Sequence, residues 1–149
     1  MKKETKEGFI LNFYQTDLED TSAIPLFGAA IKAGFPSPAD DHIENALDLN
    51  ALLIKHPAAT FFVRAEGQSM ENALIQNGDI LVVDRAVPPS HGKIVIAILN
   101  GEFTVKRIAV KGKQVTLMSE NDEFSPIVVE ENTDFQIWGV VTYIIHQAK

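Results

Sequence analysis

Cysteine is absent from the sequence of 149 residues, and basic residues are scarce. Without cysteine the chain has no disulfide, thiolate metal ligand or cysteine nucleophile, which leaves serine, threonine and lysine for covalent chemistry. The sequence has 13 lysines and arginines and 20 acidic residues, which gives a net charge of -7. Direct binding to nucleic acid is not expected, because neutralising phosphates requires clustered positive charge.

Long apolar runs are also missing. The N-terminal residues contain no apolar stretch of the kind that a signal peptide requires, because polar residues such as Glu4, Lys6 and Asn12 interrupt it. No run approaches the roughly 20 apolar residues of a membrane span. We therefore expect a soluble cytoplasmic protein without a membrane segment.

The histidines show no pattern typical of a metal site. They stand at positions 42, 56, 91 and 146, with no pair on one helical face and no neighbouring ligand set. We therefore expect neither a metal nor another cofactor.

Short runs rich in β-branched residues fill the chain from residue 60 onward. They predict strands at 60–65, 79–84, 93–99, 102–110, 114–118, 127–130 and 135–146. The pair Asn100-Gly101 favours a two-residue type I′ turn that joins two of these strands. One short helix is expected over 48–56, with Asp48 as its N-cap. The predicted fold is mainly β, a compact domain of twisted antiparallel strands with one short helix.

The first 33 residues are mixed in character and indicate a flexible N-terminal arm rather than a domain. Gly34-Phe35-Pro36-Ser37-Pro38 follows, and its two prolines hold the backbone extended, as protease substrates are usually presented. The expected organisation is an arm over 1–33 and a β domain over 34–149.

Gly67-Gln68-Ser69-Met70 and, downstream, Lys106 offer a nucleophile and a base. A serine hydroxyl is a weak nucleophile until a base takes its proton. A lysine with the ordinary pKa of about 10.4 is neutral only about 0.04% of the time at pH 7. Burial that lowered this pKa to about 8 would raise the neutral fraction to roughly 10%. The apolar neighbours Phe103 and Val105 favour such burial.

Taken singly, each residue also has an ordinary structural interpretation. Ser69 fits a loop serine or a helix cap, and Lys106 fits a solvated lysine on a strand. Other lysines, at positions 93, 111 and 113, also lie near predicted strands. Spacing alone therefore does not select the base.

Six motifs resemble, in order, those of the LexA and UmuD family of self-cleaving serine-lysine peptidases. They are Ala-Gly-Phe-Pro-Ser-Pro-Ala at 33–39, Leu-Asn-Ala-Leu-Leu-Ile at 49–54, Gly-Gln-Ser-Met at 67–70, Asn-Gly-Asp at 77–79, Ser-His-Gly at 90–92 and Gly-Glu-Phe-Thr-Val-Lys at 101–106. The resemblance runs from about residue 34 to 147 and implies the compact β fold that LexA and the signal peptidases share. Only 33 residues precede the candidate bond, too few for the DNA-binding domain of a repressor, so the UmuD type is expected.

This resemblance implies a set of roles for the residues. Ser69 would be the nucleophile, Lys106 the general base, and Ala33-Gly34 the cleaved bond. Cleavage would be stimulated by a RecA filament in the SOS response. The product would join a Y-family polymerase subunit, UmuC-like, as the accessory factor of translesion synthesis.

Two other functions compete with this interpretation. A signal peptidase shares the serine-lysine chemistry but would need a membrane anchor. A non-enzymatic dimeric adaptor could instead bind polymerase and RecA without processing itself. A homodimer is expected in either case, because the long strand predicted at 135–146 could pair across a dimer if it lay at a sheet edge.

Overall fold

The computed structural model describes residues 2–4, 10–15, 23–27, 43–66, 75–119 and 125–148. The chain divides into two compact units, one formed by Met1–Thr16 with His56–Lys149 and the other by Asp17–Lys55. A nine-stranded sheet belongs to the first unit and a two-stranded sheet to the second. The prediction of a mainly β fold with antiparallel strands is confirmed.

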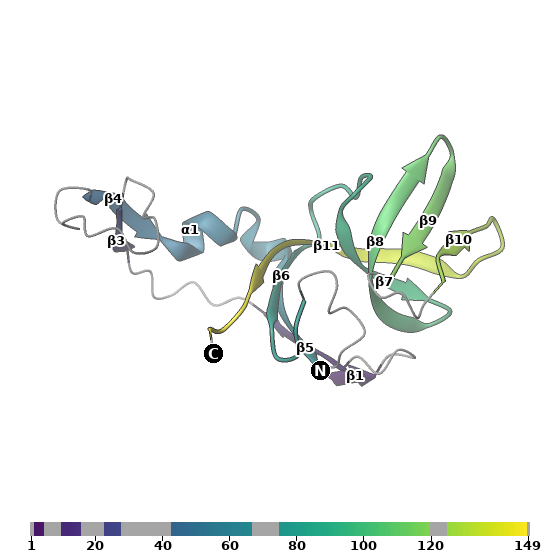
Figure 1. Cartoon of the computed structure of the whole chain (residues 1–149), viewed down its shortest axis with the longest axis horizontal. Coiled ribbons are helices and arrows are strands. Elements are labelled where there is room, and N and C mark those ends of the chain that lie inside the picture. Colours follow the sequence, from purple (N-terminus) through teal and green to yellow (C-terminus); the bar gives the residue numbers. More distant parts are fainter. Residues whose placement is uncertain are drawn as a thin grey trace. The chain divides into compact units, whose positions relative to one another are not determined.

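The large sheet has the strand order β1-β2-β5-β6-β11-β7-β8-β9-β10, and every neighbouring pair is antiparallel (Figure 1). Its strands are β1 (Lys2–Glu4), β2 (Ile10–Gln15), β5 (Thr60–Glu66), β6 (Ile80–Asp84), β7 (Ile94–Leu99), β8 (Glu102–Lys111), β9 (Gln114–Met118), β10 (Ile127–Val129) and β11 (Phe135–Ile145). The seven predicted strands coincide with β5 to β11, and their ends differ by one residue at most. The sequence patterns did not predict β1 and β2.

β11 links the two halves of this sheet. Its residues Phe135–Val140 pair with β7, and its residues Val140–Ile145 pair with β6. The strand therefore lies inside the strand order and not at either end of it. Only Val140 has a partner on both sides, because the residues before it pair with β7 alone and those after it pair with β6 alone. Pairing of this strand across a homodimer stays a prediction.

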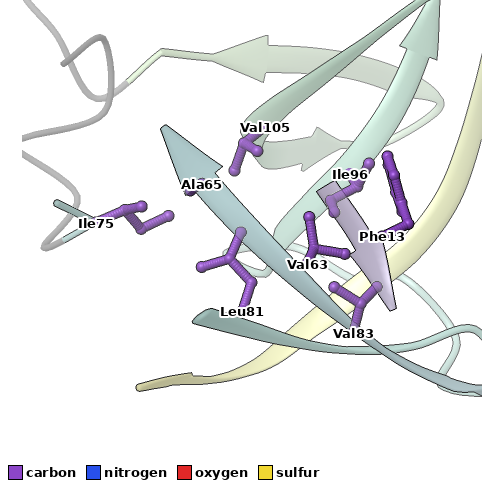
Figure 2. Close-up of a cluster of buried hydrophobic side chains, with 8 residues drawn as sticks. All are labelled: Phe13, Val63, Ala65, Ile75, Leu81, Val83, Ile96 and Val105. Atoms are coloured by element: carbon purple, nitrogen blue, oxygen red, sulfur yellow. The ribbon is translucent and has the colours of Figure 1, made fainter. Parts of the chain in front are cut away.

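Two apolar clusters occupy opposite faces of β7 and β8. The first draws on both halves of the sheet and contains Phe13, Val63, Ala65, Ile75, Leu81, Val83, Ile96 and Val105 (Figure 2). The second contains Val95, Ala97, Ile108, Leu117 and Val140. Neighbouring residues of a strand point to opposite faces, so β7 is buried on both faces and its sequence Ile-Val-Ile-Ala-Ile-Leu is apolar throughout.

The turn between β7 and β8 has the predicted geometry. Asn100 and Gly101 have φ angles of 51° and 80°. Positive φ at both central positions defines a type I′ turn, whose twist matches that of the flanking strands. The turn sets the register, in which Leu99 lies opposite Glu102 and Val95 lies opposite Lys106.

The second unit contains a two-stranded sheet and the short helix. β3 (Ala23–Phe27) pairs with β4 (Ile43–Asp48), and α1 (Leu49–Leu53) follows directly. Oδ1 of Asp48 accepts a hydrogen bond from the backbone N–H of Asn50 at 3.0 Å, which confirms the predicted N-cap. None of the helices in the described parts of the chain has the length and apolar character that a membrane span requires.

Candidate functional site

Lys106 lies in the middle of β8 and is almost completely buried, with 1% of its surface exposed. Its side chain shares a face of the sheet with Val95, directly opposite on β7, and with Ile108 two residues along its own strand. Both neighbours belong to the second apolar cluster. The fold therefore places an amine on a predominantly apolar face, as the sequence analysis expected.

Burial distinguishes Lys106 from the other candidate lysines. Lys93, Lys111 and Lys113 are all exposed, and so is Lys55. A lysine in water keeps its ammonium form, whereas removal from water disfavours that form. Among the lysines whose burial the structure describes, only Lys106 is removed from water in this way.

A cavity of about 460 Å³ adjoins Lys106. Its lining comes mainly from β8, β10 and the turn that follows β10, and it includes Glu102, Thr104, Lys106, Ile127, Val128 and Thr133. Its lining therefore contains both apolar and polar groups. Such a cavity suits a short extended peptide, which presents backbone polar groups and small side chains together.

Ser69 lies outside the described residues, but the residues on both sides of its segment are described. Ala65 near the end of β5 and Ile75 are fully buried. They belong to the same apolar cluster as Val105, the residue before Lys106 (Figure 2). The residues that flank positions 67–74 therefore pack on the face of β8 that carries Val105, which is opposite to the face that carries Lys106.

Asp79 ties the two ends of this segment together. Its Oδ2 accepts a hydrogen bond from the backbone N–H of Gln76 at 2.8 Å. Its backbone carbonyl accepts one from the N–H of Ala65 at 2.9 Å, and the N–H of Gly78 donates to the carbonyl of Ala65 at 2.7 Å. These bonds hold together the residues that flank the segment carrying Ser69.

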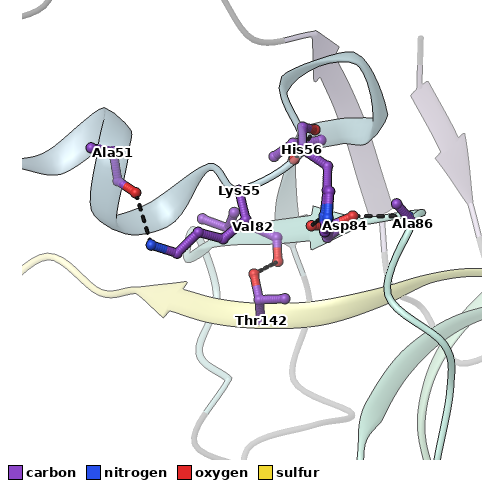
Figure 3. Close-up of polar contacts among 8 residues, drawn as sticks. Ala51, Lys55, His56, Val82, Asp84, Ala86 and Thr142 are labelled. Atoms are coloured by element: carbon purple, nitrogen blue, oxygen red, sulfur yellow. Dashed lines mark hydrogen bonds and ion pairs between the residues drawn. The ribbon is translucent and has the colours of Figure 1, made fainter.

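Two histidines pair with buried aspartates, an arrangement that sequence reasoning missed. Nδ1 of His146 lies 2.6 Å from Oδ1 of Asp79, and Nδ1 of His56 lies 2.6 Å from Oδ2 of Asp84. The remaining oxygen of Asp84 accepts a bond from the N–H of Ala86 at 2.8 Å (Figure 3). The partners stand 67 and 28 residues apart in sequence, so no local pattern could have revealed them.

The other predicted site residues cannot be placed. Ala33, Gly34 and Ser69 all lie outside the described residues. Ala33 and Gly34 belong to the connection between β3 and β4, and Ser69 belongs to the connection between β5 and β6. The structure therefore describes one member of the predicted serine-lysine pair and neither residue of the predicted cleaved bond. Within the described parts of the chain, no group of three or more histidine, aspartate or glutamate side chains is arranged to hold a metal ion.

Comparison with known proteins identifies the family of the chain. The model of the family described as Peptidase S24-like matches residues 25–142. Protein ImpA of Salmonella typhimurium is 49% identical over 132 residues, an alignment that covers 88% of this chain and 89% of ImpA. Protein MucA of Escherichia coli is 43% identical, covering 81% of this chain and 83% of MucA.

A repressor is also among the relatives. The LexA repressor of Pasteurella multocida is 38% identical over 143 residues, which cover 95% of this chain and 67% of the repressor. The similarity thus includes both shorter proteins of about this length and a longer one. The resemblance inferred from the six motifs is confirmed, and the chain belongs to the Peptidase S24-like family as a UmuD-type member of the LexA and UmuD group.

Proposed function

We propose that this protein is a cytoplasmic self-cleaving serine peptidase of the SOS response that cuts its own chain between Ala33 and Gly34. A RecA filament on single-stranded DNA stimulates the cut. The processed protein then acts as the accessory subunit of a Y-family translesion polymerase. The observation that carries the proposal is the burial of Lys106 beside a peptide-sized cavity, in a chain whose family is that of a peptidase.

The chemistry requires Lys106 to act first as a base. Removal from water disfavours the ammonium form, so we expect the pKa of Lys106 to lie below the ordinary value of about 10.4. The neutral amine takes the Ser69 proton, and Ser69 Oγ attacks the carbonyl carbon of Ala33. The lysine then returns the proton to the nitrogen of Gly34 as this amine leaves.

Water completes the reaction. It attacks the acyl-enzyme on Ser69 with Lys106 again as base, which releases the carboxylate of Ala33 and restores the serine. The substrate is tethered to the catalyst, and effective molarities of well-oriented intramolecular reactions reach about 10⁵ M or more. A modest catalyst therefore suffices, and specificity follows from the tether.

The tether also makes the reaction controllable. If the bond rests mostly away from Ser69, a partner that prefers the docked arrangement raises the rate by shifting the population. The RecA filament has this role in the proposal. Both the trigger and the chemistry can therefore be tested separately.

Mass spectrometry of the purified protein tests the proposal. The protein is incubated at neutral and alkaline pH, with and without RecA, an ATP analogue and single-stranded DNA. We expect a new fragment that begins at Gly34, absent from Ser69→Ala and from Lys106→Ala. Lys111→Ala is the matched control, because this lysine lies on the same strand but is exposed.

Two results would contradict the proposal. Cleavage that persists in Lys106→Ala would exclude this lysine as the base. An intact wild-type chain under every condition would instead favour the adaptor that binds polymerase and RecA without processing itself.

A further inference from the structure

β2 is held in the large sheet although it belongs to the arm that the proposed cut would detach. It pairs antiparallel with β5 over six residues, from Ile10 opposite Glu66 to Gln15 opposite Phe61. β1 in turn pairs with β2. The chain from β2 to the rest of the domain runs through residues 33 and 34, so after a cut there only noncovalent contacts would hold both strands.

Among the β2 side chains that the structure describes, Phe13 is the buried one. It is 8% exposed and belongs to the first apolar cluster. Its ring centroid lies 5.0 Å from that of Phe103 on β8 and 5.0 Å from that of Trp138 on β11. The next residue, Tyr14, is 50% exposed and points to the opposite face. β2 therefore inserts one aromatic ring into the domain and leaves its neighbour in solvent.

Departure of β2 would leave two complementary features. The backbone groups of β5 that face β2 would lose their ladder, which creates a sheet edge able to pair with another strand. The rings of Phe103 and Trp138 would lose their contact with the ring of Phe13. A backbone ladder binds any extended segment, and a pocket for alternate side chains supplies the specificity.

We propose that the edge of β5 is an exchangeable strand-binding site. β2 fills it in the uncleaved protein, and an extended segment of a partner protein fills it after cleavage, with an aromatic side chain in place of Phe13. The inference rests on the proposed cut at Ala33-Gly34. Before the cut, the tether keeps β2 at a high effective concentration and excludes competitors. After the cut, the covalent tether is gone and the partner segment competes with β2 for β5, although the pairing of β3 with β4 still holds the arm near the domain.

The test uses a cut that does not depend on self-cleavage. In the Ser69→Ala protein, the recognition sequence of a site-specific protease replaces residues 28–34, and this protease nicks the folded chain. The probe is a fluorescent peptide with the sequence of residues 8–17, whose binding is followed by anisotropy. Release of the arm is followed by mass spectrometry, and Trp138 is an intrinsic reporter because the sequence has a single tryptophan.

We expect the peptide to bind nicked protein at least about tenfold more tightly than intact protein, with release of the arm. A Phe13→Ala peptide should bind about tenfold more weakly or worse, because it leaves the pocket empty. A Tyr14→Ala peptide is the matched control and should lose much less affinity. Trp138 emission should shift to the red on arm release and return when the peptide binds.

Three outcomes would overturn the inference. They are equal affinity for nicked and intact protein, no binding to nicked protein, and equal binding by the Phe13→Ala peptide. Failure of the proposed function is distinct from these, because wild-type protein that never cleaves itself would leave the result with the engineered nick unchanged.

Discussion

His146, just beyond the end of β11, hydrogen-bonds to Asp79, just before the start of β6, with Nδ1 and Oδ1 2.6 Å apart. The bond needs a proton on one of the two atoms, and with an ionised carboxylate this proton is on Nδ1 of His146. The contact extends the β6–β11 ladder, in which Ile145 lies opposite Ile80, by one side-chain bond. Asp79 is 2% exposed, and its other carboxylate oxygen accepts a hydrogen bond from the N–H of Gln76. Its side chain therefore joins the C-terminal segment to the residues that follow the segment carrying Ser69.

Substitution of Asp79 should destabilise the protein more than substitution of its partner. Asp79→Ala leaves the Gln76 N–H without its acceptor and should lower the free energy of unfolding by about 1–3 kcal/mol. His146→Ala should cost less, because water can reach the half-exposed side of the pair. Urea unfolding measures both. Gln147→Ala, at an exposed neighbour, is the control and should stay within about 0.5 kcal/mol of wild type.

Lys106→Met should separate stability from activity. Methionine has a similar length and no amine, so it fills the same space on the apolar face without the desolvation cost of a buried polar group. We expect a free energy of unfolding within about 1.5 kcal/mol of wild type together with complete loss of self-cleavage. Lys111→Met should change neither. Retained cleavage in Lys106→Met would show that another group is the base.

The rate of self-cleavage should rise with pH. Only the neutral amine of Lys106 accepts the serine proton, so below its pKa the rate should increase about tenfold for each pH unit and then level off. The measurement is the rate of appearance of the fragment that begins at Gly34, in the absence of RecA. A rate that is flat from neutral to strongly alkaline pH would count against the serine-lysine pair.

The strands from residue 60 onward could be predicted because their signals are local. β-branched runs and the Asn100-Gly101 turn each specify a strand or a turn within a few residues. The first four strands were missed for the converse reason. β3 has the sequence Ala-Ile-Pro-Leu-Phe, whose proline is unusual in a strand, and β2 is a short mixed run whose place is set by pairing with the distant β5.

The candidate site was only partly readable from the sequence. Spacing could not choose among the lysines, because burial depends on which strands cover each face of β8. The fold separates the lysines by burial, since Lys106 shares its face with Val95 and Ile108 while Lys111 lies near the exposed end of the same strand. The role of Lys106 as the base stays a prediction. The motifs that indicated Ser69 and Ala33-Gly34 did so through resemblance, and their roles remain predictions.

Gly139 on β11 should not tolerate alanine. A Cβ at this position would lie 2.5 Å from Cγ1 of the fully buried Val83 and 3.2 Å from Cγ of Arg85. Overpacking of this kind usually costs about 1–3 kcal/mol, so Gly139→Ala should lower the free energy of unfolding by that amount in urea. Val83→Ala removes the methyl group that clashes. The double variant should therefore lose less stability than the sum of the two single variants. Additive losses would mean that the strand shifts away from Val83 and that close packing is not why this position is glycine.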